Sequence, residues 1–169
     1  NGGTWHTTKT QLIGTYNLSN VLAAVAVGAH FGVVEQQIDE ALAGYAPGNN
    51  RSQFIKTEDN QLVVDAYNAN PTSMMAALEN FEKMEAAHKM VILGEMRELG
   101  DDSAAEHQKI VELLTTMRLE QVWLVGSSFV GLDHEFRCFN NVDEVKEAVE
   151  TEKPHNATIL IKGSNGTRL

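Results

Sequence analysis

Short β-branched runs alternate with segments of helical period from Leu62 onward, and this alternation limits the fold more than any other feature of the chain. The order is strand, helix, strand, helix, strand, helix, strand. Helical connections between consecutive strands favour a parallel sheet with helices on both faces. The predicted strands are 53–57, 61–64, 89–93, 121–125, 136–139 and 157–161, and the predicted helices in this part are 71–86, 101–117 and 141–151. We therefore expect an α/β fold with a mostly parallel, doubly wound, Rossmann-like sheet.

Polar segments follow the predicted strands at the point where each strand ends. They are Asp65–Asn70, Gly94–Glu95, Gly126–Ser127 and Lys162–Ser164. Because the carboxyl ends of parallel strands lie along one edge of a sheet, we expect these segments to gather on one rim, where ligands bind in such folds. At that rim Glu95 is either a functional group or a solvated loop carboxylate.

The first 48 residues have a different pattern from the rest. Residues 17–31 form a predicted helix that is apolar almost all round, and we expect it to be buried on most sides. A second helix is predicted over 35–43. Glycine, proline and asparagine then cluster over 44–50, which is typical of a linker. We place a domain boundary there, with a helical unit over 1–48 attached to an α/β domain over 49–169.

The charge balance narrows the choice of partners. Lys and Arg number 13 against 23 Asp and Glu, a net charge of −10. This surplus argues against a nucleic-acid backbone or an anionic membrane as the main partner, although a local phosphate site for ATP remains compatible with it. The longest apolar stretch, 21–29, is shorter than the roughly 20 residues of a membrane span. Cys138 is the single cysteine, which excludes an internal disulfide and fits a reducing cytoplasm.

The turn Asp65–Pro71 concentrates a carboxylate, a phenol and two amides between a buried strand and a helix. Asn70 is the predicted N-cap of that helix and Pro71 its first residue. Asp65 suits the diol of a ribose, whereas the amides suit a peptide or a carboxylate. The residues alone leave a second interpretation open, in which Asp65 and Asn68 only stabilise the turn.

The same turn resembles a known signature. The run Asp-x-Tyr-Asn-Ala-Asn-Pro at 65–71 is similar to the C-terminal-domain motif of the Mur ligases, in the form found in those that add D-alanyl-D-alanine. The segment 13–24, Ile-Gly-x-Tyr-Asn-x-x-Asn-x-x-Ala-Ala, is similar to the end of the family's central ATPase domain. Residues 94–100 and the Lys-Gly-Ser run at 162–164 resemble further family segments. These matches follow the family's order and span nearly the whole chain.

The resemblance assigns a nucleotide-binding role to four residues. It implies that Asn17 and Asn20 lie at the adenine, that Arg51 reaches the ATP phosphates and that Asp65 contacts the ribose. Arginine suits phosphate because its guanidinium is always charged and binds two oxygens at once. Without the resemblance, Asn17 would be a helix cap, Asn20 a surface residue and Arg51 a solvated side chain. The family usually has histidine at the position of Tyr16, so an imidazole contact there is lost.

The resemblance also implies an acceptor site. Asn68, Asn70 and Ser164 would bind the dipeptide D-alanyl-D-alanine, and Tyr67 would shape the pocket around it. Without the resemblance, the segment 162–166 is a plain turn. The implied reaction uses ATP to activate the carboxylate of UDP-N-acetylmuramoyl-tripeptide as an acyl phosphate, which the amine of the dipeptide then attacks. We expect no nucleic-acid partner, no membrane insertion and a cytoplasmic monomer.

The chain has no Gly-x-x-x-x-Gly-Lys-Ser/Thr phosphate loop and no His, Cys and carboxylate cluster typical of a metal site. His107 has no such partners and is expected to be structural. We therefore expect a fragment that is inactive alone, with no complete catalytic set and with Mg bound mainly by the central domain.

Two alternatives remain open. One is another ligase of the superfamily, of the folylpolyglutamate or cyanophycin type, which the Tyr-Asn-Ala-Asn-Pro run disfavours. The other is a non-catalytic, flavodoxin-like binding module. The loop after the first parallel strand is poor in glycine, which disfavours a flavin phosphate.

Overall fold

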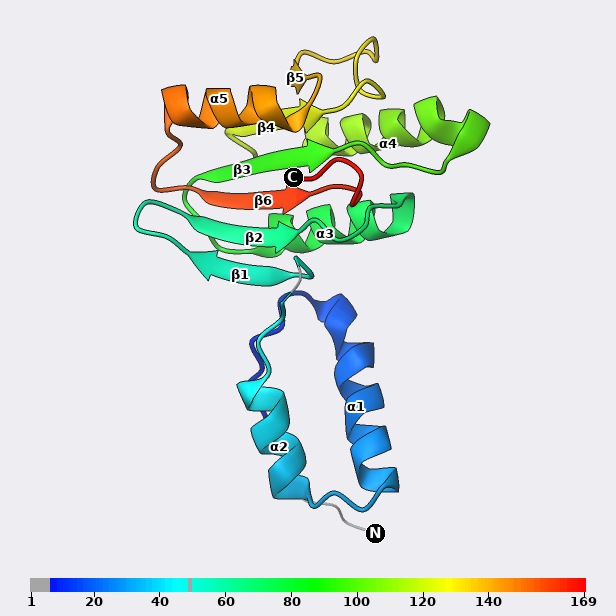
Figure 1. Cartoon of the computed structure of the whole chain (residues 1–169), viewed down its shortest axis with the longest axis vertical. Coiled ribbons are helices and arrows are strands. Elements are labelled where there is room, and N and C mark those ends of the chain that lie inside the picture. The colour runs from blue at the N-terminus through cyan, green and yellow to red at the C-terminus, as the bar shows by residue number, and fades with distance from the viewer. Residues whose placement is uncertain (1–6, 49) are drawn as a thin grey trace.

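The computed structural model describes residues 7–48 and 50–169 of the chain, which form two visibly different parts (Figure 1). Residues 50–169 contain a sheet with helices packed against it, and we call this part the body. The helices α1 (Leu18–His30) and α2 (Glu35–Gly44) lie side by side and project away from the body. We call these two helices the helical pair. A single 3₁₀ turn, η1 (Thr15–Asn17), precedes α1.

The body is built on one six-stranded sheet with the order β1-β2-β6-β3-β4-β5. Its strands are β1 (Gln53–Lys56), β2 (Gln61–Asp65), β3 (Lys89–Gly94), β4 (Gln121–Val125), β5 (Arg137–Phe139) and β6 (Thr158–Lys162). Only β1 is antiparallel, because it forms a hairpin with β2; the other neighbours are parallel. The predicted, mostly parallel α/β sheet is therefore confirmed.

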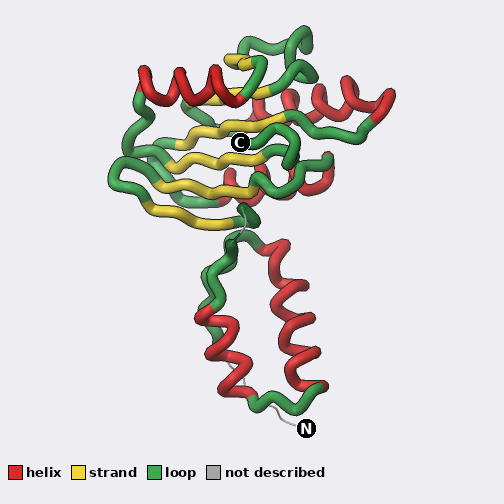
Figure 2. Tube along the Cα trace, in the orientation of Figure 1, coloured by secondary structure: helices red, strands yellow, loops and turns green. Residues whose placement is uncertain are grey.

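Helices cover both faces of this sheet (Figure 2). They are α3 (Pro71–Lys83), α4 (Ser103–Thr116) and α5 (Val142–Glu152), with a 3₁₀ turn, η2 (Gly100–Asp102), before α4. Alternate residues of β3 face opposite cores. Val91 and Leu93 join the cluster formed with α3 and α4, whereas Met90 and Ile92 join the cluster formed with α5. This two-sided burial explains why β3 is a continuous apolar run.

The helical pair corrects one prediction. We expected the helix over 17–31 to be buried on most sides, but α1 has no buried residue among those described. Leu22 is 58% exposed and Phe31 is 77% exposed. The physical reason is that α1 packs mainly against α2 and η1, so most of its apolar surface has no partner among the described residues. The helix is apolar as expected, but the described residues cover only a small part of its surface.

Short polar and apolar contacts attach the helical pair to the body. Ile13, just before η1, packs against the core that lies under α3 and α4. The hydroxyl of Thr15 donates to the side-chain oxygen of Asn80 on α3 at 3.3 Å. Pro47, in the returning linker, is buried. Both connections meet the body near β1 and β2, so the base of the helical pair lies beside the carboxyl end of β2.

Candidate functional site

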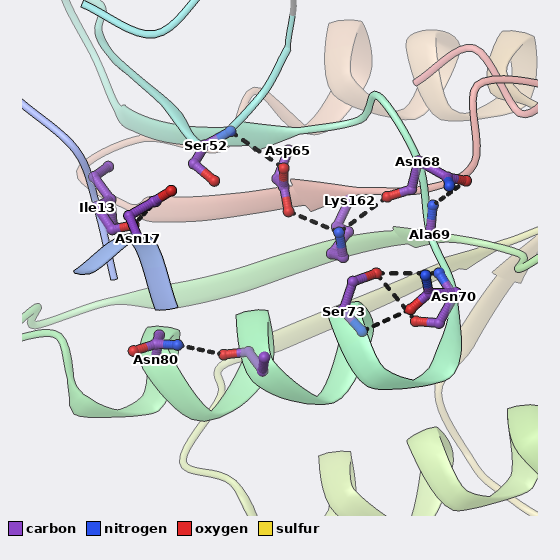
Figure 3. A network of polar contacts seen from close by, with 11 residues as sticks. Ile13, Asn17, Ser52, Asp65, Asn68, Ala69, Asn70, Ser73, Asn80 and Lys162 are labelled. Carbon is purple, nitrogen blue, oxygen red and sulfur yellow. Dashed lines mark hydrogen bonds and ion pairs between the residues drawn. The ribbon is translucent and has the colours of Figure 1, made fainter. Parts of the chain in front are cut away.

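The centre of the site is an ion pair between the last residues of two neighbouring parallel strands. Asp65 ends β2 and Lys162 ends β6, and they are direct partners in the strand register. Side chains at paired positions of a sheet point to the same face. The Lys162 Nζ accordingly lies 2.7 Å from the Asp65 Oδ2 (Figure 3). The lysine is 1% exposed and the aspartate side chain 18%, so the carboxylate retains a route to solvent.

The second oxygen of Asp65 is held by the linker. The backbone N–H of Ser52 donates to the Asp65 Oδ1 at 3.2 Å. Asn50 and Ser52 both have positive φ values, of 56° and 46°. Non-glycine residues adopt that conformation at a cost, and such strain persists where the surroundings impose it. The strained linker therefore aims one amide at the carboxylate from the side that faces the helical pair.

Arg51 and Tyr67 meet above this carboxylate turn. The guanidinium carbon of Arg51 lies 3.6 Å from the centroid of the Tyr67 ring, in cation–π geometry. Both side chains are exposed. At an exposed site such a contact contributes about 0.5–1 kcal/mol, which orients the guanidinium without fixing it. Arg51 thus keeps the freedom to turn its donors toward an anion in the adjacent cavity.

The rest of the turn forms the start of α3. The side-chain oxygen of Asn70 accepts from the backbone of Ser73 at 2.8 Å, while the Ser73 hydroxyl accepts from the Asn70 N–H at 3.1 Å. This reciprocal pair is a capping box, and it confirms the predicted cap. The side-chain oxygen of Asn68 accepts from Ala69 at 2.9 Å, and its backbone carbonyl accepts from Lys162 at 3.1 Å. Both asparagines are exposed, and their side-chain nitrogens are not used in these bonds, so they remain potential donors.

Asn17 and Asn20 are coupled at the base of α1. The side-chain amide of Asn20 donates to the side-chain oxygen of Asn17 at 3.0 Å, and the Asn17 amide donates to the Ile13 carbonyl at 2.8 Å. Asn17 is the N-cap residue by position, yet its side chain makes no cap bond. The two amides therefore form a fixed polar pair instead of a helix cap. The side chain of Tyr16 lies outside the described part of the structure.

A cavity of about 870 Å³ joins these groups, and its size suits a small-molecule ligand. One part of its wall is formed by residues of α1 and α2, and another part by residues at the carboxyl ends of β2 and β6. The predicted site residues on its wall are Asn17, Asn20, Arg51, Asp65, Tyr67, Asn68 and Asn70. Ser164 is the exception, since it is buried, hydrogen-bonded to Thr167 at 2.9 Å, and not part of the wall.

Lys162 lines the cavity, although sequence reasoning assigned it no role. The signal that could have identified it was its place at the end of a predicted parallel strand, on the same rim as Asp65.

Glu95, at the end of β3, lies at a different part of that rim. It accepts from the backbone and hydroxyl of Ser128 at 3.2 and 3.0 Å, and it lies 3.7 Å from Arg97. Its carboxylate is therefore satisfied within the fold.

The described residues offer neither a metal cluster nor a membrane span. Among them, no group of three or more His, Cys, Asp and Glu side chains is arranged to hold a metal ion. No helix within 7–48 and 50–169 has the length and apolarity required to cross a membrane. The polar groups on the cavity wall include the carboxylate of Asp65, the cations Arg51 and Lys162, and several side-chain amides. This set suits hydrogen bonding to a polar anionic ligand.

The doubly wound sheet, with its polar cavity at the strand ends, defines the class of Rossmann-like α/β domains, which hold ligands at that edge. Residues 50–165 match the family model described as Mur ligase, glutamate ligase domain. The chain belongs to this family.

Named relatives extend the match beyond the body. The chain is 31% identical to the UDP-N-acetylmuramoyl-tripeptide–D-alanyl-D-alanine ligase of Bacillus subtilis, over 94% of the chain and 37% of that protein. It therefore spans little more than a third of that relative's length. A crystal structure of MurF from Acinetobacter baumannii aligns with a TM-score of 0.82 and 28% identity, over 95% of the chain and 37% of its own. A Thermotoga maritima MurF in complex with ADP shares the fold, with a TM-score of 0.76 at 20% identity over 93% and 36%.

Proposed function

We propose that this chain is the carboxyl-terminal part of an ATP-dependent ligase that adds D-alanyl-D-alanine to UDP-N-acetylmuramoyl-tripeptide. In this proposal residues 1–48 are the end of a central ATPase domain and 49–169 are the C-terminal domain. One observation carries it: a single cavity gathers the predicted nucleotide residues and most of the predicted acceptor residues. The names of the relatives support the same substrate pair over another ligase of the superfamily.

The nucleotide would occupy the cavity with its ribose at Asp65. A carboxylate has about four acceptor positions, and the described contacts of Asp65 use one on each oxygen. One lone pair on each oxygen is left for the two hydroxyls of a ribose. The amides of Asn17 and Asn20 would read the adenine edge between α1 and α2, and Arg51 would swing from Tyr67 to the phosphates.

The acceptor dipeptide would bind on the other side of the same turn. The side-chain amides of Asn68 and Asn70 are suitable donors for its carboxylate, and the half-exposed ring of Tyr67 offers an apolar wall. Ser164 lies two residues beyond Lys162 and outside the cavity wall, so its contact with the dipeptide requires Thr167 to release its hydroxyl. Of the four proposed acceptor residues, Ser164 therefore has the least support.

The chemical role of this chain is positioning. ATP would supply the phosphoryl group that turns the tripeptide carboxylate into an acyl phosphate, and the dipeptide amine would then displace phosphate to form the amide. Holding the nucleoside and the amine on one rigid turn lowers the entropy cost of bringing them together. The described residues hold no cluster that fits a metal ion, and in this proposal Mg would be held mainly by residues outside this chain.

The test is an assay of phosphate release by the complete ligase. Release should require ATP, UDP-N-acetylmuramoyl-tripeptide and D-alanyl-D-alanine together, and the 169-residue chain alone should be inactive. Asp65→Asn should raise the KM for ATP about tenfold or more, because it removes a charged hydrogen-bond acceptor. Asp143→Asn is the matched control, since Asp143 is an exposed carboxylate that pairs with Lys146 on α5. A preference for glutamate as acceptor, or activity of the isolated chain, would overturn the proposal.

A further inference from the structure

Lys162 is the most deeply buried charged side chain on the cavity wall, and it joins two parts of the site. Its Nζ donates to the Asp65 Oδ2 at 2.7 Å and to the Asn68 carbonyl at 3.1 Å. Asp65 stands at the start of the turn between β2 and α3, and Asn68 lies in its middle. One ammonium therefore fixes both the carboxylate at the strand end and the backbone that leads to Tyr67 and Asn70 (Figure 3).

Stability alone does not explain a lysine at this position. Removing an ammonium from water is costly, and replacing a buried ion pair with apolar side chains is often neutral or stabilising. The neighbouring residues on β6, Ile161 and Leu160, show that this strand accommodates aliphatic side chains. The ammonium instead orients the Asp65 carboxylate, because it holds one carboxylate oxygen while the Ser52 amide holds the other.

We propose that Lys162 is a positioning residue for nucleotide binding, which acts by fixing the Asp65 carboxylate with one lone pair of each oxygen directed to the ribose diol. This inference rests on the proposed function, in which Asp65 receives the ribose. The two donors approach the carboxylate from different segments of the chain, Lys162 from β6 and Ser52 from the linker, so it cannot rotate without breaking one of these bonds. The diol then meets two acceptors that are already in place.

The second contact of Lys162 extends the same effect to the acceptor side. The Asn68 carbonyl is tied to the ammonium that orients Asp65, so the nucleoside and the dipeptide are bound by one rigid unit. Loss of the ammonium should therefore weaken the binding of both the nucleotide and the dipeptide. The effect on nucleotide binding should be larger, because Asp65 loses a charged partner. The affinity for the UDP-linked substrate should not change, since no group of that ligand is assigned to this turn.

The experiment compares Lys162→Met with wild type in the complete ligase, using ATP and 2′,3′-dideoxy-ATP as ligands in direct binding measurements. Methionine matches the length of the lysine stem and removes the charge. Wild type should bind ATP about tenfold more tightly than Lys162→Met, as expected for loss of hydrogen bonding to a charged group. The two proteins should bind the dideoxy nucleotide equally, because it has no diol. Lys146→Met, at an exposed lysine on α5, is the control.

A double-mutant cycle with Asp65→Asn supplies the second criterion. If Lys162 acts through Asp65, the methionine substitution should have almost no further effect on ATP affinity in the Asp65→Asn background. The double variant also removes both charges together, so it is expected to fold if Lys162→Met alone does not. Circular dichroism of each variant confirms folding before binding is compared.

The outcomes separate this inference from the proposed function. If wild type does not bind ATP at all, the proposed function fails. Suppose that wild type binds ATP but that Lys162→Met lowers the affinity for ATP and for the dideoxy nucleotide by the same factor. Lys162 then contacts the phosphates or only supports the fold, and the positioning role is refuted. Additive effects in the cycle would refute it as well.

Discussion

The buried imidazole of His107 allows a precise test of how the loop after β3 is held. The ring is fully buried, with 0% exposure. Its Nε2 accepts from the backbone N–H of Met96 at 2.9 Å, and its Nδ1 donates to the Ser103 carbonyl at 2.7 Å. Because a backbone N–H can only donate, the ring must carry its proton on Nδ1. Phe129 packs edge-on against it, with ring centroids 4.8 Å apart.

We expect His107→Leu to lower the free energy of unfolding by about 3 kcal/mol. The unpaired Met96 N–H costs about 1–3 kcal/mol and the lost edge-to-face contact about 0.5–1.5 kcal/mol. The Ser103 carbonyl adds little, because it is in the first turn of α4 and keeps its backbone partner. His107→Gln should recover roughly half of the loss, since the glutamine side-chain oxygen reaches about as far as Nε2 and can accept from Met96.

The assay is urea denaturation followed by the fluorescence of Trp123, which is buried in the core under α5, in a Trp5→Phe background. In a thermal melt of the same variant, the corresponding fall in Tm is about 6–12 °C for a chain of this size. His155→Leu is the control, since His155 is exposed and its Nδ1 donates to the nearby Lys153 carbonyl at 3.2 Å. A loss below about 0.5 kcal/mol for His107→Leu, or a glutamine variant no better than leucine, would refute the satisfied-imidazole explanation.

Three further predictions concern other parts of the body. Gly126→Ala should cost about 1–3 kcal/mol of stability, because its φ is 118° and the new Cβ would lie 2.6 Å from the Glu95 carboxyl carbon. Gly44→Ala, with open space around the new Cβ, should cost far less in the same urea assay. Burial raises the pKa of the Cys138 thiol, so its reaction with a thiol reagent at pH 8 should be slower than that of free cysteine and should speed up on unfolding. The stability contributed by the buried, neutral Cys138 thiol is present below its pKa in the unfolded chain and is lost as the pH rises through its raised pKa in the folded protein. A denaturation series from pH 7 to 10 checks that sign. Asn70→Asp should keep the helix cap while Asn70→Ala loses about 1 kcal/mol, and acceptor KM values for the two variants separate capping from dipeptide binding.

The sequence was informative wherever local chemistry determines structure. The period of the apolar residues predicted every strand and helix of the body, and the Asn70-Pro71 pair predicted the start of α3. The order of elements also predicted that the polar strand ends would share a rim. These features depend on neighbours within about one turn or on a general rule for parallel sheets, so a single sequence contains them.

Two features could not be predicted, because both depend on partners distant in the chain or outside it. The pairing of Asp65 with Lys162 joins residues 97 positions apart, and it follows from β6 returning between β2 and β3 instead of extending the sheet at an edge. The exposure of α1 depends on which surface covers it, which its own composition does not reveal. An apolar helix predicts that burial is required, but it does not identify the partner.

The position of β6 links the fold to the proposed chemistry. The chain builds β2, β3, β4 and β5 outward with α3 and α4 on one face, then α5 returns along the other face and inserts β6 beside β2. That return places the last residue of β6 against the last residue of β2, so a lysine and an aspartate meet on the cavity wall. If β6 had formed an edge strand, the carboxylate would have had no buried cation to orient it. In the proposed function, this strand order is the structural reason that the ribose and the acceptor would bind at one turn.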